Sequence, residues 1–98
     1  MSLKNTKFKG LKVIQGKNYY DSRGFFKEVF VQSKLKFHKP VFWCVSKSKK
    51  NVLRGLHLQT KNSQEKFVSV LKGKMLDVVI DLRRKSKTFG KHFKISLA

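Results

Sequence analysis

The run Arg54-Gly55-Leu56-His57-Leu58-Gln59 contains the side chain best suited to acid–base chemistry, the imidazole of His57. Side chains alternate between the two faces of an extended strand, so His57 shares a face with Gly55 and Gln59. A neutral imidazole, with an ordinary pKa of about 6.5, can accept a proton when it lines a cavity. Taken alone, this run favours a surface or hydrogen-bonded structural histidine over a catalytic one.

The guanidinium of Arg54 is a second candidate group in the same run. Arg54 has the opposite parity to His57, so a regular strand would send the two side chains to opposite faces. A β-bulge at Gly55 would bring both side chains to one face, and we predict a bulge there.

A second strand-like run, 75–83, supplies two carboxylates. Its alternation predicts a core face formed by Leu76, Val78, Ile80 and Leu82. Asp77 and Asp81 fall on the other face, where a carboxylate among apolar neighbours is costly unless it is paired. The partners available to Asp77 are His57, Lys66 and Arg54. A solvated acid on an exposed face explains Asp77 equally well.

No metal or cofactor site is expected. A transition-metal site needs converging ligands such as a His-x-His pair with a nearby Glu, and here His57 is followed by Gln59 instead. His38 and His92 have no suitably spaced partner. The single cysteine, Cys44, is predicted to be buried and inert. Because no glycine-rich phosphate loop is present, arginine side chains would have to hold a diphosphate.

These residues lie on a chain whose composition favours strands. Segments rich in β-branched or aromatic residues predict strands over 25–32, 41–46, 52–59, 67–71, 75–82 and 92–97, with a weaker one over 11–14. A helical turn is expected over 33–37 and a hairpin turn over 72–74. The pattern predicts one all-β domain, 1–98, forming a sandwich or barrel. The last strand ends at Ala98, so we expect an open barrel, either incomplete or closed by a second copy.

The charge of the chain is extreme. Lysine and arginine total 24 against five acids, which gives a formal net charge of +19 over 98 residues. Such a surface attracts polyanions in a salt-dependent way. The bases are mostly lysines spread along the whole chain, so a solvated surface is favoured over a nucleic-acid interface. No apolar run is long enough for a membrane span or a signal peptide, and one cysteine fits a reducing compartment. A soluble cytoplasmic protein is expected.

Several motifs together resemble the dTDP-4-dehydrorhamnose 3,5-epimerase family. Residues 21–28, DSRGFFKE, match its D-x-R-G-F-F-x-E, and residues 46–59, SKSKKNVLRGLHLQ, match its S-x-S-x-x-x-V-L-R-G-L-H-x-Q. Residues 64–66 (QEK), 77–83 (DVVIDLR) and 86–90 (SKTFG) take the places of its Q-G-K, D-V-x-x-D-x-R and S-P-T-F-G. The matches keep their order and spacing from about residue 11 to the end of the chain.

The resemblance implies a metal-free and cofactor-free cupin-type jelly roll, usually a homodimer with strands exchanged between subunits. It implies an isomerase that acts on a dTDP-linked 4-keto-6-deoxy sugar in dTDP-rhamnose and cell-surface polysaccharide biosynthesis. In that picture His57 is the general base, Lys66 stabilises the enolate oxyanion and Asp77 tunes their charge. The implied substrate-binding residues are Arg23, Phe26, Glu28, Arg54 and Gln59. Of these, Arg23 and Arg54 would clamp the diphosphate, with Arg23 contributed across the dimer.

Two departures from the family pattern affect these expectations. Residues 42–45, FWCV, are apolar where the family has Q-D-N-H. The general-acid tyrosine and the histidine-paired aspartate belong to the family's other half, and neither Tyr19 nor Tyr20 matches that tyrosine. The alternatives are an inactive nucleotide-sugar-binding module and a related sugar-nucleotide isomerase. A more distant alternative is a basic β-barrel that binds nucleic acid.

Overall fold

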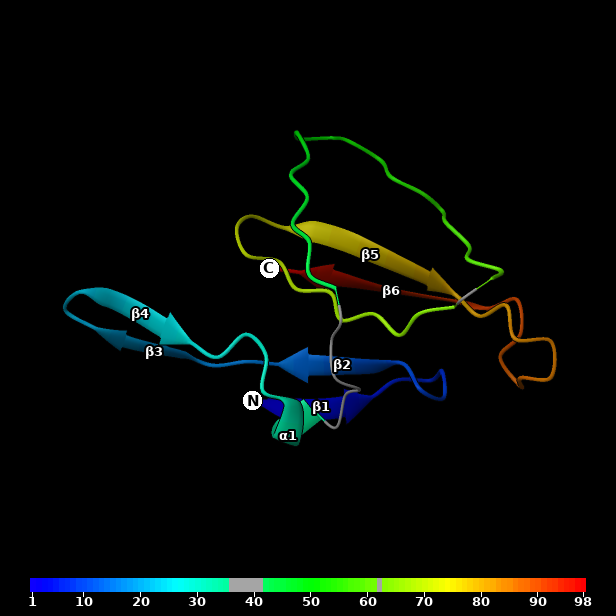
Figure 1. The fold of residues 1–98 in the computed structure, drawn as a ribbon, viewed down its shortest axis with the longest axis horizontal. Coiled ribbons are helices and arrows are strands. Elements are labelled where there is room, and N and C mark those ends of the chain that lie inside the picture. Colours follow the sequence, from blue (N-terminus) through cyan, green and yellow to red (C-terminus); the bar gives the residue numbers. More distant parts are fainter. Residues whose placement is uncertain (36–41, 62) are drawn as a thin grey trace.

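The computed structural model describes residues 1–35, 42–61 and 63–98. Within these ranges the chain forms six strands and one short helix. In chain order they are β1 (Ser2–Asn5), β2 (Lys12–Gln15), β3 (Asn18–Asp21), β4 (Gly24–Lys27), α1 (Gln32–Leu35), β5 (Met75–Ile80) and β6 (His92–Leu97). The strands pair in sequence as three antiparallel hairpins, β1–β2, β3–β4 and β5–β6 (Figure 1). The all-β class is therefore confirmed, and these hairpins form an open assembly rather than a closed barrel.

Local sequence explains the tight turn of the β3–β4 hairpin. Asp21 and Gly24 are paired across it, leaving a two-residue loop. The Asp21 carboxylate accepts a hydrogen bond of 2.8 Å from the backbone N–H of Arg23, as aspartates do at turns. Gly24 has a φ of 139°, which residues with side chains rarely adopt.

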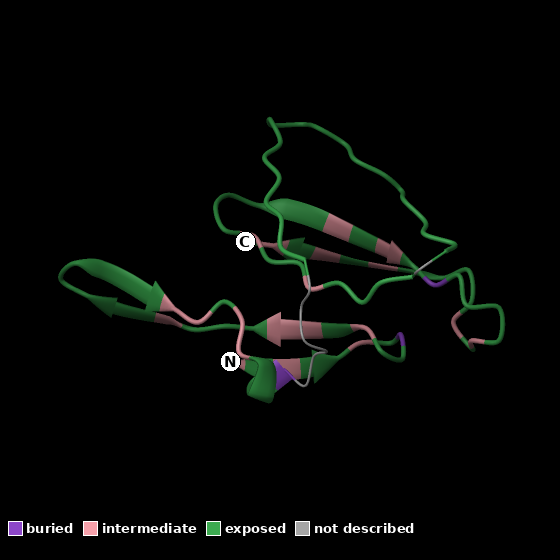
Figure 2. Cartoon of the chain, viewed as in Figure 1, coloured by how far each residue is buried: buried purple, intermediate pink, exposed green. Residues whose placement is uncertain are grey.

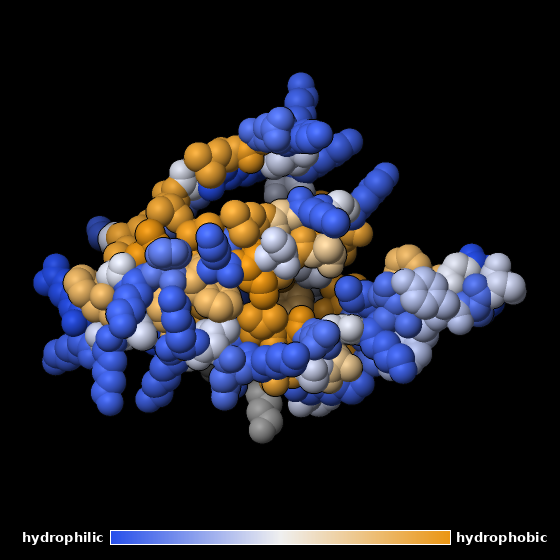
Figure 3. All heavy atoms as spheres, turned by 180° about the vertical axis from the view of Figure 1, so that it is seen from behind, coloured by the Kyte–Doolittle hydropathy of each residue, from blue (hydrophilic) through white to orange (hydrophobic). Residues whose placement is uncertain are grey.

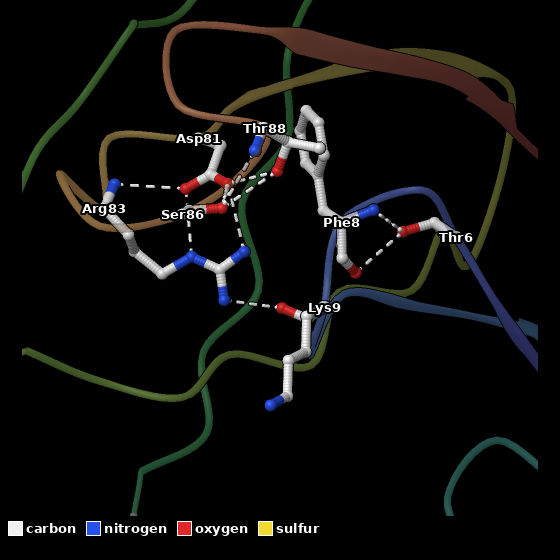
Figure 4. Close-up of polar contacts among 7 residues, drawn as sticks. All are labelled: Thr6, Phe8, Lys9, Asp81, Arg83, Ser86 and Thr88. Atoms are coloured by element: carbon white, nitrogen blue, oxygen red, sulfur yellow. Dashed lines mark hydrogen bonds and ion pairs between the residues drawn. The ribbon is translucent and has the colours of Figure 1, made fainter.

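The connection between β5 and β6 is organised by the buried carboxylate of Asp81 (Figure 4). It accepts hydrogen bonds from the backbone N–H of Arg83 at 3.0 Å, from Arg83 Nε at 2.9 Å and from the hydroxyls of Ser86 and Thr88. Arg83 also donates from Nη1 to the carbonyl of Lys9 at 2.6 Å. The network therefore ties the β5–β6 hairpin to the turn between β1 and β2.

Apolar packing between the hairpins is thin. In the part of the chain that the structure describes, the only buried apolar residues are Phe8 and Leu35. The Phe8 ring lies 6.3 Å from the ring of Phe93 on β6, close to the Arg83 contact. Figure 2 shows that most of the remaining chain is exposed.

Several predicted strands are absent as paired strands. Residues 52–59, 67–71 and the described part of 41–46 form no ladder, because a strand needs a neighbour for its backbone groups and these segments have none here. The hairpin predicted at 72–74 is wrong, since β5 pairs with β6. The bulge predicted at Gly55 is also wrong, because no ladder passes through that residue.

The other predicted elements differ from the observed ones by a few residues at their ends. The segment 92–97 is confirmed as β6, whereas 75–82 ends at Ile80 and 25–32 shrinks to β4. The strand expected at 11–14 is β2, and β1 and β3 were not predicted. The turn expected over 33–37 corresponds to α1, with residues 36 and 37 outside the described ranges.

The predicted core face of β5 is also wrong. Leu76, Val78 and Ile80 are exposed, as is Leu82, while the face carrying Asp77 and Val79 is half-buried. The reason is that the sheet has only two strands here, and one of its faces lies open. Cys44 is exposed rather than buried, because 42–61 runs as an extended segment outside the hairpins (Figure 1).

Candidate active site

A cavity of about 600 Å³ is lined by residues from several segments that are far apart in the sequence. Its lining comes from β2, β4 and β5, from the segments 56–58 and 64–70, and from the end of the chain. Four of the predicted site residues line it: Glu28, His57, Lys66 and Asp77. Its volume falls in the range of about 300–1,000 Å³ that is usual for small-molecule sites. In Figure 3, apolar atoms gather at the centre of the molecule and hydrophilic side chains project around them.

Strand β5 positions Asp77. The residue is paired with Ile95 of β6 and is half-buried on the same face as Val79. Asp77 was predicted to lie on the face opposite the core. In the structure, that face is the one turned toward the interior of the open fold. Its carboxylate has no hydrogen-bond or ion-pair partner among the described residues.

Gly55 governs the placement of His57. Its φ of 103° lies in the region that favours glycine. A methyl group built on Gly55 would lie 3.4 Å from both the backbone nitrogen and Nδ1 of His57. The exposed imidazole thus lies beside the Gly55 backbone, at a distance where a methyl group on Gly55 would make an ordinary van der Waals contact with it.

Lys66 and Glu28 reach the cavity from different segments. Lys66 is exposed in the unpaired segment 64–70, and Glu28 is half-buried just after β4. Lys34 of α1 donates to both carboxylate oxygens of Glu28, at 3.0 and 3.2 Å. The negative charge of Glu28 is thereby balanced from outside the cavity.

Arg23 and Phe26 lie away from this cavity. Both line a shallow hollow on the β3–β4 hairpin, which projects from the rest of the fold (Figure 1). The Arg23 guanidinium forms a 2.8 Å ion pair with Asp21. This hydrogen-bonded pairing with Arg23 lowers the pKa of Asp21 below its ordinary value.

Arg54 and Gln59 are also outside the cavity lining. The Arg54 guanidinium donates to the backbone carbonyl of Lys47 at 3.0 Å, and Gln59 is exposed. The apolar residues at 42–45 are exposed too, and none of them lines the cavity. His57, Lys66 and Asp77 therefore line one cavity, whereas Arg23 and Arg54 do not.

Sequence reasoning missed four polar residues of the cavity: Lys12, Lys27, Gln64 and Ser69. Lys27 occupies a variable position of its motif, so no pattern marked it. Its place directly before Glu28, at the end of an aromatic strand, was the available signal.

The cavity combines groups that suit proton transfer beside an anion. An imidazole can remove a proton from carbon, while lysine ammonium groups can stabilise the negative charge that develops. Among residues 1–35, 42–61 and 63–98, no three His, Cys, Asp or Glu side chains are grouped so as to hold a metal ion. No helix in those same ranges is long and apolar enough to cross a membrane.

Comparison with known proteins points to one family. The family model described as dTDP-4-dehydrorhamnose 3,5-epimerase matches residues 5–98. Proteins named dTDP-4-dehydrorhamnose 3,5-epimerase are similar to the chain: that of Neisseria gonorrhoeae is 40% identical over 95 residues, and that of Salmonella typhimurium 41% over 92. That of Escherichia coli is 37% identical over 97 residues. No solved structure is significantly similar.

The matches cover most of this chain but only part of each relative. They span 93%, 88% and 93% of the chain against 29%, 50% and 52% of the Neisseria, Salmonella and Escherichia proteins. The chain thus spans about half the length, or less, of these relatives. Since the family model covers nearly all of its residues, the chain belongs to the dTDP-4-dehydrorhamnose 3,5-epimerase family.

Proposed function

We propose that this chain carries the proton-abstracting site of a sugar-nucleotide epimerase acting on a dTDP-linked 4-keto-6-deoxy sugar, in dTDP-rhamnose biosynthesis. The observation that supports the proposal is the shared cavity, whose lining includes His57, Lys66 and Asp77. Family membership over residues 5–98 supplies the reaction class. The cavity volume of about 600 Å³ is sufficient for a small-molecule substrate.

The reaction assigns a role to each of these three groups. The imidazole of His57 removes the proton from a carbon next to the keto group, and the electron pair of that C–H bond forms an enolate. The ammonium of Lys66 stabilises the enolate oxygen, which carries charge only once the proton leaves. Asp77, half-buried on β5 and lining the same cavity, supplies a negative charge opposite in sign to the imidazolium that forms. Return of a proton from the opposite face inverts the carbon.

The remaining predicted residues are proposed to bind substrate, with Glu28 doing so inside the cavity. We further propose a homodimer in which Arg23 and Phe26 of one copy reach the cavity of the other. Their position on a projecting hairpin, outside the cavity of their own chain, supports this arrangement (Figure 1). Arg54 and Gln59 flank residues 56–58 of the cavity lining in the sequence, which supports assigning them to the same site. The exposed free thiol of Cys44 is compatible with a cytoplasmic location.

Solvent isotope exchange tests the proposal. The chain is incubated with dTDP-4-keto-6-deoxyglucose in deuterated water, and deuterium at the carbons beside the keto group is followed by NMR. We expect incorporation that falls by at least about 100-fold in His57→Asn, since a general base contributes roughly 10²–10⁴-fold. The matched control is His92→Asn, which changes an exposed histidine of β6 outside the cavity lining. No deuterium incorporation by the unaltered chain would refute the proposal.

A nucleotide-sugar-binding module without turnover is the second candidate. The observation that favours it is that neither Tyr19 nor Tyr20 lines the cavity, so no described tyrosine is placed to return a proton. In that case calorimetry with dTDP detects binding while no isotope exchange occurs. Exchange without inversion would instead indicate a working base that lacks its acid.

A further inference from the structure

The cavity contains a cation to which the motif resemblance gives no role, Lys27 at the end of β4. In the pattern D-x-R-G-F-F-x-E it fills the variable position. Lys27 is half-buried at the cavity, whereas the implied diphosphate clamps, Arg23 and Arg54, lie outside it and already bind Asp21 and the Lys47 carbonyl. An anion entering this cavity therefore meets Lys27 without any movement of the arginines.

The end of the Lys27 side chain lies beside Gly16, which also lines the cavity. A methyl group built on Gly16 would be 2.9 Å from Lys27 Cε and 3.7 Å from Nζ. The absence of a side chain at position 16 leaves the space that the end of Lys27 occupies. The ammonium consequently lies against the part of the cavity wall formed by Gly16.

The charge of Lys27 is not balanced by the carboxylate that follows it. Glu28 is paired with Lys34 through both of its oxygens. Across residues 1–35, 42–61 and 63–98, no group forms a hydrogen bond or ion pair with the Lys27 ammonium. Its three donors are free to bind an anion.

An unsatisfied acceptor belongs to the residue paired with Lys27. Asn18 is the register partner of Lys27, so the two side chains leave the same face of the β3–β4 hairpin. Asn18 Nδ2 donates to the Tyr20 hydroxyl at 3.0 Å, but Asn18 Oδ1 is buried with no donor in the described part of the chain. Asn18 does not line the cavity, so this acceptor is not assigned to the ligand.

We propose that Lys27, which lies beside Gly16 in the cavity lining, binds a phosphate group of the nucleotide diphosphate in this cavity. This inference rests on the proposed function, because it names a contact for that ligand. It assigns the phosphate to a lysine of the cavity itself, which acts as a compact point charge.

Calorimetric titration with dTDP, and with thymidine as the phosphate-free probe, tests this contact. We expect Lys27→Gln to weaken dTDP binding by about tenfold or more, because hydrogen bonds between charged groups are strong, and to leave thymidine binding unchanged. The matched control is Lys17→Gln. Lys17 is exposed on the same part of the chain, with its ammonium 5.2 Å from the Tyr19 ring centroid, and its loss is expected to change affinity by less than about twofold.

Two further variants separate position from charge. Lys27→Arg keeps the charge and should retain most of the dTDP affinity. Gly16→Ala also keeps every charge and displaces only the flexible end of Lys27, so it should weaken dTDP binding less than Lys27→Gln does. Unchanged dTDP affinity in Lys27→Gln, or equal losses in Lys27→Gln and Lys17→Gln, would overturn the inference and leave the proposed function standing. Failure of the unaltered chain to bind dTDP would overturn both.

Discussion

Among single residues, Gly55 affects the position of His57 through its backbone, although it has no side chain. Its φ of 103°, in the region that favours glycine, sets the direction of the chain entering His57. A residue without functional groups therefore decides where the proposed base lies. This role is positional, because Gly55 itself does not line the cavity.

We predict that Gly55→Ala displaces the His57 ring. Alanine is strained at this φ, so the backbone leading into His57 should shift. The methyl group itself, 3.4 Å from the His57 Nδ1, would be at ordinary contact distance. The NMR signals of the His57 imidazole should shift, and isotope exchange should fall by about tenfold or more, since small misplacements of catalytic groups are costly. Gly73→Ala is the control, because Gly73 has a φ of 91° but open space around its Cα. Equal effects of the two variants would assign the result to backbone strain alone.

At the scale of elements, the sequence indicated where strand-forming residues lie but not which segments pair. The strand β6 was predicted with its observed bounds, because apolar and polar residues alternate cleanly through 92–97. The segments 52–59 and 67–71 have a similar composition but no ladder, since strand preference describes a fit to neighbours and cannot supply them. His57, Lys66 and Asp77 could be chosen by chemical type. The role proposed for Lys27 could not, because it depends on contact with a glycine of another segment.

The β5–β6 connection should depend on the charge of Asp81. Its hydrogen bonds from Arg83, Ser86 and Thr88 hold the pKa of this carboxyl far below its ordinary value. The unfolded chain therefore takes up a proton before the folded one does, so the stabilisation is complete above the unfolded pKa of about 3.9 and is lost as the pH falls below it. We predict that Asp81→Asn lowers the melting temperature by about 4 °C or more at pH 7.

The difference in melting temperature between Asp81→Asn and the unaltered chain should narrow as the pH is lowered from 5 toward about 2, because protonation removes the charge that the variant already lacks. Asp21→Asn is the matched control. Asp21 has the same kind of partner, Arg23, but the pair is exposed, so its loss should have little effect. If the difference in melting temperature between Asp81→Asn and the unaltered chain did not change with pH, the negative charge of Asp81 would not be what stabilises the β5–β6 connection.

At the scale of the whole molecule, the chain exposes far more surface than a compact protein of its mass. Its accessible surface is 9479 Å², whereas scaling from folded monomers gives about 5,800 Å². Part of the excess is the open face of β5, where Leu76 is 62% exposed. Apolar surface of this kind favours association with a second copy, while the net charge of +19 opposes it. Ionic strength therefore decides whether apolar attraction or charge repulsion between two copies is stronger.

We predict that raising the salt concentration from about 50 to 500 mM shifts the chain from monomer toward dimer, because screening weakens the repulsion between two copies more than it weakens apolar contact. Sedimentation velocity at both concentrations measures the shift. Leu76→Ser should reduce dimer formation at high salt, since it removes apolar surface from the open face of β5. Leu71→Ser is the control, because Leu71 is similarly exposed, at 68%, but lies in the bend before the strand. If the chain stays monomeric at 500 mM salt, or if both substitutions have the same effect on dimer formation, the open face of β5 is excluded as the contact between copies. The exposed apolar surface would then have to bind a different partner.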